Sequence, residues 1–122
     1  MRILIAGAGA TGGYFGARLI QAGRNVTFLV RPRLAEQLRD GLRLNGPGGK
    51  ETVPVATVTT KDLKGTYDLV VVAVKAGALP TVIDQIAPAL GEETMILPFL
   101  NGMAHLTALT NRFRAAQVLG GS

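Results

Sequence analysis

The 122-residue sequence predicts an α/β fold: an open parallel sheet with helices on both faces and one inserted β-hairpin. Short apolar runs alternate with segments of helical period, which is typical of strand–helix–strand units and a parallel sheet. The apolar runs are continuous, as expected for strands that are covered on both faces. One turn-rich segment interrupts the alternation and is interpreted as the hairpin. The length suits a single compact domain over residues 1–122.

The elements follow one another along the chain with a strand first. Strands are expected at residues 2–6, 25–30, 69–74, 94–98 and 117–119, and helices at residues 10–22, 33–40, 78–87 and 103–114. The helix at 78–87 has the clearest amphipathic pattern, with apolar residues at i, i+3, i+4 and i+7 counted from Leu79. Gly23 stands where a glycine commonly ends a helix.

The inserted hairpin is expected within residues 41–60. The β-type segments Leu42-Arg43-Leu44 and Val53-Pro54-Val55 flank the turn-rich run Asn45-Gly46-Pro47-Gly48-Gly49. Two strand-forming segments separated by such a run are typical of a hairpin. It would extend the connection between the second strand and the rest of the sheet.

The composition excludes several classes of site. The chain has no cysteine and one histidine, so it offers no disulfide, no thiolate or multi-histidine metal site and no cysteine nucleophile. No apolar run approaches the roughly 18 residues of a membrane span. The first strand starts at residue 2 without a signal-peptide pattern. We therefore expect no bound metal, no membrane association and a cytoplasmic location.

The positive charge is concentrated in the first part of the chain. Residues 1–50 carry eight Arg and Lys against two acidic residues, whereas residues 51–122 carry five against six. A basic half is compatible with a nucleic acid, an anionic cofactor or a solvated face. The arginines stand singly among few aromatic residues, which argues against a nucleic-acid partner.

A glycine-rich turn identifies the kind of ligand. The run Gly7-Ala8-Gly9-Ala10-Thr11-Gly12 follows the first strand and opens the first helix, which is the context that gives this motif its meaning. Gly7 would allow the tight turn, Gly9 the approach of the pyrophosphate, and Gly12 close packing of helix on strand. The helix N-terminus would offer free N–H groups to the phosphates. The sequence thus predicts a Rossmann-type dinucleotide site.

The end of the second strand indicates which dinucleotide binds. An acidic residue there binds the ribose of NAD, while an arginine accommodates the 2′-phosphate of NADP. This chain has Val30-Arg31-Pro32-Arg33, with no acidic residue between positions 13 and 35. Arg31 can make a charge-assisted, two-pronged contact with a phosphate. We expect NADP(H), although an arginine at a strand end can also be merely solvated.

Two further residues are expected at the carboxyl edge of the sheet, where ligands of open α/β sheets bind. Lys75 follows the strand at 69–74 and could face the cofactor phosphates or the substrate, or be a solvated strand end. Asn101 could orient a nicotinamide amide or a substrate oxygen, or cap the helix at 103–114. His105 is expected on a surface or in packing. No residue stands out as the proton donor that ketone reduction requires, so no catalytic residue is assigned.

The ordered motifs resemble those of the ketopantoate reductase (2-dehydropantoate 2-reductase) family. The matching runs are Ile3 to Leu19, Val26-Thr27-Phe28-Leu29-Val30-Arg31, Asp68 to Ala76, Asn101-Gly102-Met103 and Val118-Leu119-Gly120-Gly121. The resemblance implies reduction of the ketone of 2-dehydropantoate with NADPH, a step of pantothenate biosynthesis. It implies cofactor roles for the glycine turn and Arg31, and places Lys75 and Asn101 at the cofactor–substrate edge.

The resemblance also implies that part of the enzyme is absent. Family members carry their proton-donating lysine in a following helical domain, and no position here corresponds to it. Leu100 departs from the family, whose members often have a polar residue before Asn-Gly. We therefore expect a truncated cofactor domain with little turnover alone. Self-association through the apolar residues near 99–103 and 118–122 is also expected.

Two other functions remain open from the sequence. A non-catalytic module that senses a nucleotide would share the glycine turn, but Arg31 is unlike the acidic strand end that such modules often carry. An S-adenosylmethionine-dependent methyltransferase would also have a glycine-rich first turn. It would leave Arg31 and the Asn101-Gly102 pair without a role, and a reductase of a related 2-oxo acid explains both.

Overall fold

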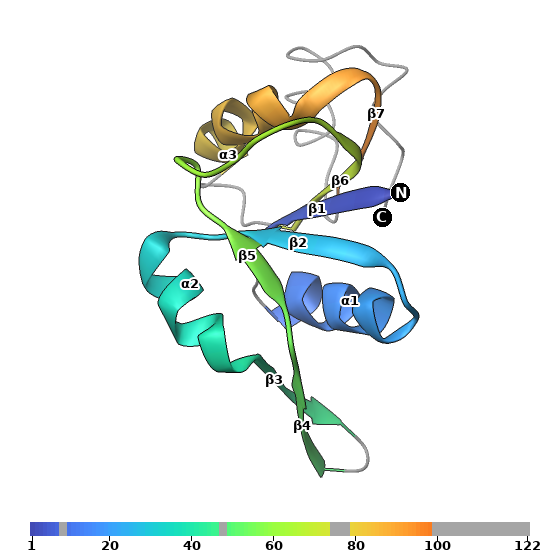
Figure 1. Ribbon diagram of the computed structural model, residues 1–122, viewed down its shortest axis with the longest axis vertical. Coiled ribbons are helices and arrows are strands. Elements are labelled where there is room, and N and C mark those ends of the chain that lie inside the picture. The colour runs from blue at the N-terminus through green and yellow to red at the C-terminus, as the bar shows by residue number, and fades with distance from the viewer. Residues whose placement is uncertain (8–9, 47–48, 74–78, 99–122) are drawn as a thin grey trace.

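The computed structural model describes residues 1–7, 10–46, 49–73 and 79–98, and within them it confirms the expected α/β fold. Five strands form one parallel sheet in the order β5-β2-β1-β6-β7 (Figure 1). The sheet strands are β1 (Arg2–Ala6), β2 (Asn25–Leu29), β5 (Ala56–Val58), β6 (Tyr67–Val72) and β7 (Leu90–Pro98). The helices are α1 (Ala10–Gln21), α2 (Pro32–Gln37) and α3 (Leu79–Ile86).

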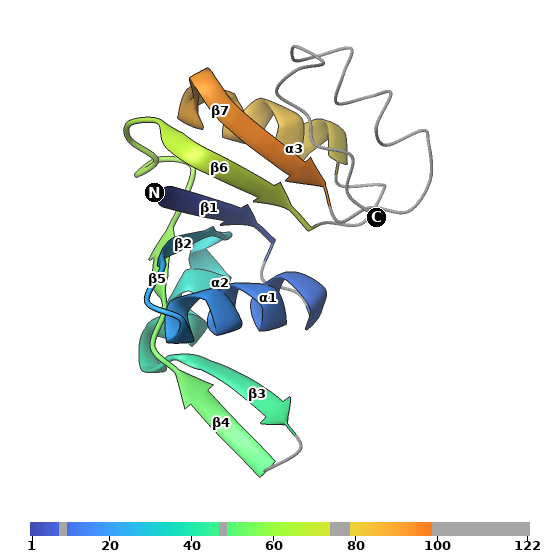
Figure 2. The same cartoon turned by 90° about the vertical axis from the view of Figure 1, so that its right-hand side faces the viewer.

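The helices cover both faces of the sheet, as predicted. Figures 1 and 2 show α1 and α2 on one face and α3 on the other. Successive residues of a strand point to opposite faces, so β1 supplies Leu4 to the core beneath α3 and Ile5 to the core beneath α1. Both side chains are fully buried. Burial on two faces explains why the apolar runs of these strands are continuous.

The approach of α1 to the sheet depends on Gly16. A Cβ atom at this position would lie 2.6 Å from Cδ1 of Ile5 and would also collide with the ring of Phe28. Any side chain would therefore push the helix away from β1 and β2. Gly16 therefore allows close packing of this helix on the sheet. The packing role predicted for Gly12 falls outside the described side chains and stays a prediction.

The predicted hairpin is present as the antiparallel pair β3 (Leu42–Gly46) and β4 (Gly49–Val53). It extends away from the sheet beyond α1 and α2 (Figure 2). Its base packs on α1, where Val53 and Leu42 contact the cluster of Ala17 and Ile20. Gly41 enters the hairpin with φ 105°, a conformation that other residues rarely adopt.

Several boundaries differ from those predicted. The expected helix at 33–40 is α-helical only over α2 and continues as a 3₁₀ turn at Leu38–Asp40. The strand expected at 69–74 already begins at Tyr67. That expected at 94–98 begins at Leu90, where the ladder with β6 is irregular. There the hydroxyl of Thr94 accepts from the N–H of Gly91 and donates to the carbonyl of Tyr67.

The largest correction concerns residues 56–58, which the sequence placed in the hairpin segment. They form β5, which pairs in parallel with β2 and joins the main sheet. The strand is only three residues long and begins three positions after the last strand of the hairpin, so the local sequence pattern could not distinguish it from the hairpin.

The predicted strand at 117–119 and the predicted helix at 103–114 lie outside the described residues. Among the described helices, none is long and apolar enough to cross a membrane.

Candidate functional site

The candidate site lies at the carboxyl edge of the parallel sheet. The last residues of its strands stand in register, because Leu29 pairs with Val58 and Ala6, and Val72 pairs with Ala6 and Pro98. In Figure 2 the arrowheads of β1, β6 and β7 point to the same side, where α1 begins. Ligands of open α/β sheets bind at this edge.

The glycine turn begins at this edge. Gly7 follows β1 with φ 104°, and its N–H donates to the carbonyl of Leu29 at 3.4 Å. On the other side of β1, the hydrogen bonding to β6 continues beyond the end of that strand, because the N–H of Ala73 donates to the carbonyl of Ala6 at 3.0 Å. The turn leads into α1, whose first N–H groups have no partner within the helix. Ala8 and Gly9 lie outside the described residues, as do the side chains of Ala10, Thr11 and Gly12.

Arg31 occupies the predicted place at the end of β2. The preceding Val30 is buried and its N–H donates to the carbonyl of Val58 at 3.0 Å, so the backbone is fixed up to this point. Arg31 itself is exposed and extended, with φ −70° and ψ 153°, and Pro32 follows as the first residue of α2. No ion pair or side-chain hydrogen bond to Arg31 is present among the described residues. Its guanidinium is available to an anion.

The other two predicted site residues lie outside the described part of the chain. These are Lys75, which follows β6, and Asn101, which follows β7. The strands that precede them end at the carboxyl edge, as the sequence predicted. Their proposed contacts with a cofactor or substrate remain predictions.

The structure also brings Lys61 to this edge, which the sequence did not predict. Lys61 lies in the turn after β5, and β5 is the neighbour of β2. It is exposed and has no partner among the described residues. The signal that could have found it is the parallel strand at residues 56–58, because a parallel strand ends at the same edge as its neighbours.

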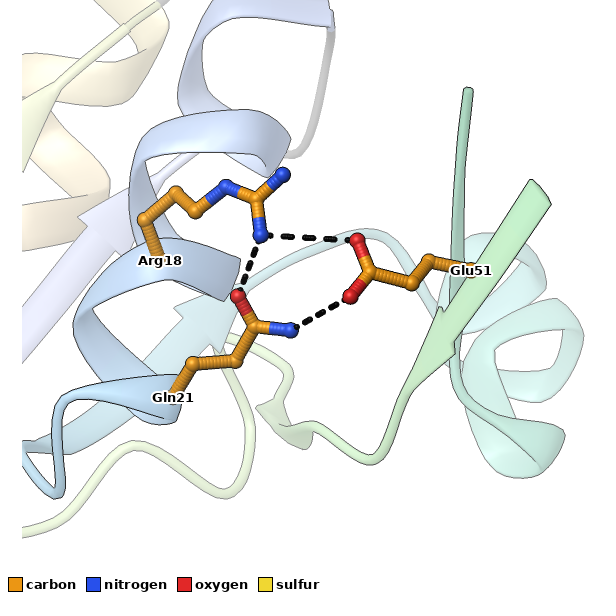
Figure 3. Close-up of polar contacts among 3 residues, drawn as sticks. All are labelled: Arg18, Gln21 and Glu51. Carbon is orange, nitrogen blue, oxygen red and sulfur yellow. Dashed lines mark hydrogen bonds and ion pairs between the residues drawn. The ribbon is translucent and has the colours of Figure 1, made fainter. Parts of the chain in front are cut away.

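The outer surface of α1 carries a separate polar cluster (Figure 3). Nη1 of Arg18 donates to Oε1 of Gln21 at 2.6 Å and lies 3.4 Å from Oε2 of Glu51 on β4. Nε2 of Gln21 donates to the other oxygen of Glu51 at 3.1 Å. The pKa of Arg18 is raised above its usual value, mainly by the side-chain interaction with Tyr14 and further by the negative charge of Glu51. This cluster joins the hairpin to α1.

No metal centre is formed by the part of the chain that the structure describes. It contains no group of three or more His, Cys, Asp or Glu side chains that could hold an ion. The features at the carboxyl edge are a glycine turn, a helix start and unpaired cations. Together they suit an anionic organic ligand such as a dinucleotide.

Comparison with known proteins places this geometry in a family. The family model described as "Ketopantoate reductase PanE/ApbA" matches residues 3–122. The chain belongs to the ketopantoate reductase family. It is therefore part of an oxidoreductase family that binds pyridine nucleotides and small-molecule substrates, in agreement with the glycine turn at the sheet edge.

Relatives of the family cover nearly the whole chain but are much longer. An uncharacterized oxidoreductase, YkpB of Bacillus subtilis, is 41% identical over 122 residues, which are 99% of this chain and 40% of the relative. A 2-dehydropantoate 2-reductase of Mesorhizobium japonicum is 40% identical over 105 residues, 84% of this chain and 32% of the relative. The chain thus spans about two fifths or less of these proteins.

A solved structure extends the likeness to a related dehydrogenase. D-mandelate dehydrogenase, solved with NADH and anilino(oxo)acetate, has a TM-score of 0.88 and 27% sequence identity. The match covers 97% of this chain and 39% of that one. The fold therefore occurs in family neighbours that differ in substrate.

Proposed function

We propose that this chain is the NADPH-binding domain of a 2-dehydropantoate 2-reductase. The enzyme would transfer a hydride to the ketone of 2-dehydropantoate and give pantoate, in pantothenate biosynthesis and in the cytoplasm. The observation that carries the cofactor assignment is the exposed Arg31, two residues after the end of β2, which has no side-chain partner among the described residues. An arginine at this point matches the 2′-phosphate of NADP, whereas NAD sites carry an acidic residue.

The described residues fit such a cofactor. The positive φ of Gly7 turns the chain sharply between β1 and α1, and the run Gly7-Ala8-Gly9-Ala10-Thr11-Gly12 would hold the pyrophosphate. Gly16 lets α1 lie close on the sheet, which fixes the start of that helix at the carboxyl edge. When bound, the cofactor would supply the hydride. Arg31 would hold its 2′-phosphate.

Lys75 and Asn101 would act at the cofactor–substrate edge. A lysine ammonium next to the ketone oxygen would stabilise the negative charge that develops during reduction. The amide of Asn101 can both donate and accept, so it could orient a nicotinamide amide or a substrate oxygen. Both roles rest on the family resemblance and on the positions of β6 and β7.

The proton for the alkoxide is proposed to come from outside these 122 residues. Protonation requires an acid within hydrogen-bond reach of the ketone oxygen, and the sequence assigns none. The relatives extend well beyond the matched region. We expect the chain alone to bind NADPH with little turnover of 2-dehydropantoate. Robust turnover would show that the acid lies within this chain.

A reductase of a related 2-oxo acid is the second candidate. The structural likeness to D-mandelate dehydrogenase, whose solved complex holds NADH and anilino(oxo)acetate, favours it. Assay of a protein that contains this domain together with a C-terminal catalytic domain, with 2-dehydropantoate and phenylglyoxylate as competing substrates, would separate the two. A higher kcat/KM for phenylglyoxylate would overturn the pantoate assignment.

Cofactor preference can be tested on the chain itself. Titration calorimetry should show tighter binding of NADPH than of NADH, and Arg31→Ala should remove most of the difference. The expected loss is about 1.5–3 kcal/mol of NADPH binding free energy, the range for hydrogen bonds to charged groups. Arg39→Ala is a control, because Arg39 is also exposed but lies in the 3₁₀ turn after α2. Equal affinity of the unmodified chain for both cofactors would contradict the NADP assignment.

A further inference from the structure

Three exposed cations follow the carboxyl ends of two neighbouring strands. Arg31 and Arg33 follow β2, and Lys61 follows β5. Arg31 and Lys61 are thirty residues apart in sequence. The strand pair β2–β5 is what brings their segments to the same corner of the sheet (Figure 1).

The backbone fixes this corner on both sides. Leu29 pairs with Val58, and the N–H of Val30 donates to the carbonyl of Val58 at 3.0 Å. Paired strands run about 4.8 Å apart, so the two segments leave the sheet side by side. Residues 59–62 then form a tight turn, in which the N–H of Asp62 donates to the carbonyl of Thr59 at 3.0 Å.

The acidic side chains Asp62 and Glu36 on the same segments form no ion pairs with these cations. The carboxylate of Asp62 accepts a hydrogen bond from the hydroxyl of Thr59 at 3.0 Å and forms no ion pair with Lys61. Glu36 stands three residues after Arg33 on α2 and likewise forms no ion pair with it. The three cations have no side-chain partner among the described residues, so all three are available to an anion.

We propose that Lys61, together with Arg33, completes the subsite for the 2′-phosphate that Arg31 begins. This inference rests on the proposed NADPH-binding function. The ligand chemistry is that of a phosphate monoester on a ribose, which accepts charge-assisted hydrogen bonds from several directions. Arg31 would provide the two-pronged contact, and Lys61 a point charge from the neighbouring strand. Arg33 would add charge from the same side as Arg31.

The test compares cofactor affinities of Lys61→Gln and Lys64→Gln by calorimetry on the chain. Lys64 belongs to the same connection between β5 and β6 and is also exposed, but lies farther from the end of β5. We expect Lys61→Gln to weaken NADPH binding about three- to tenfold and leave NADH binding unchanged, as for loss of one partly solvated charge. Lys64→Gln should change neither, and Arg33→Gln should behave like Lys61→Gln with a smaller effect.

The outcomes separate this inference from the proposed function. If Arg31→Ala abolishes the preference for NADPH and Lys61→Gln does not alter it, Lys61 has no part in the subsite. If Lys61→Gln weakens the binding of NADPH and NADH equally, the role of Lys61 is structural and the inference fails. If Arg31→Ala leaves the preference intact, the proposed NADP site is itself wrong. A titration with inorganic phosphate tests whether the corner binds the free anion. We expect phosphate to compete with the binding of NADPH but not with that of NADH.

Discussion

Arg2 and Arg31 lie at opposite ends of the parallel sheet and differ in the partners that the chain offers them. At the amino end, Nη1 of Arg2 donates to the carbonyl of Thr66 at 2.9 Å, and its guanidinium lies 4.2 Å from the centre of the Tyr67 ring. The backbone N–H of Arg2 donates to Oδ2 of Asp68 at 2.6 Å. At the carboxyl end, Arg31 and Lys61 have no partner among the described residues.

The presence or absence of partners within the chain distinguishes a cation that stabilises the fold from one that is available to bind a ligand. A cation whose donors are satisfied within the chain stabilises the chain and has little left for an anion. A cation without such partners contributes little to folding and can bind an anion at full strength. Substitution of Arg2 should therefore change stability, and substitution of Arg31 or Lys61 should change cofactor affinity.

The largest effect on stability and on cofactor binding should come from Gly16→Ala. Gly16 lies in α1, the helix that runs between the two ends of the sheet. The added methyl group would collide with Phe28 and Ile5, so the helix must shift. We expect a loss of about 1–3 kcal/mol in the free energy of unfolding, the usual range for overpacking, together with weaker binding of both cofactors. Urea denaturation and calorimetry measure the two effects.

Arg2→Ala should destabilise the chain without altering cofactor binding. It removes one hydrogen bond and the contact with Tyr67, worth about 1 kcal/mol together because the site is exposed. Thermal denaturation would report the loss, and calorimetry should give unchanged affinities. Arg24→Ala is a suitable control, because Arg24 is an exposed arginine near the same end with no side-chain partner among the described residues. A change in NADPH selectivity on Arg2→Ala would break the contrast between the two ends.

The smallest effect is expected for Glu51→Gln in the cluster that joins the hairpin to α1. Arg18 and Glu51 are 38% and 46% exposed, and exposed ion pairs contribute about 0–1 kcal/mol. The free energy of unfolding lost on Glu51→Gln should be smaller at high salt than at low salt, because screening already weakens the ion pair in the unmodified chain. Denaturation at low and high salt measures it, with Glu36→Gln as a control that breaks no ion pair. A loss above 2 kcal/mol would show that the hairpin is held mainly by this cluster.

Much of the fold could be predicted because its signals are local. The continuous apolar runs of β1, β2 and β6 reflect burial on two faces, and the glycine run between residues 7 and 12 stands where the first turn must be tight. The hairpin was predicted from its turn-rich centre. These patterns depend on residues close together in sequence, which is why boundaries moved by only a few positions.

Other features depend on contacts between distant segments. The three residues of β5 carry no periodic pattern of their own, and only their pairing with β2 makes them a strand. In the sequence, Gly16 is one of several glycines in the first helix. Its contact with the ring of Phe28 shows why this position requires a glycine. Lys61 was missed for the same reason, because its position depends on a strand that local pattern did not reveal.

The sequence by itself determined the glycine turn and the arginine at the end of the second strand, since each is a short run with a fixed chemical meaning. Only the tertiary structure decided which cations remain without a partner and which of them share a corner of the sheet. The physical reason is that availability to a ligand depends on every neighbour in space. Arg2 and Arg31 are the same residue type, each beside a buried strand, and the partners around them make one structural and the other free to bind.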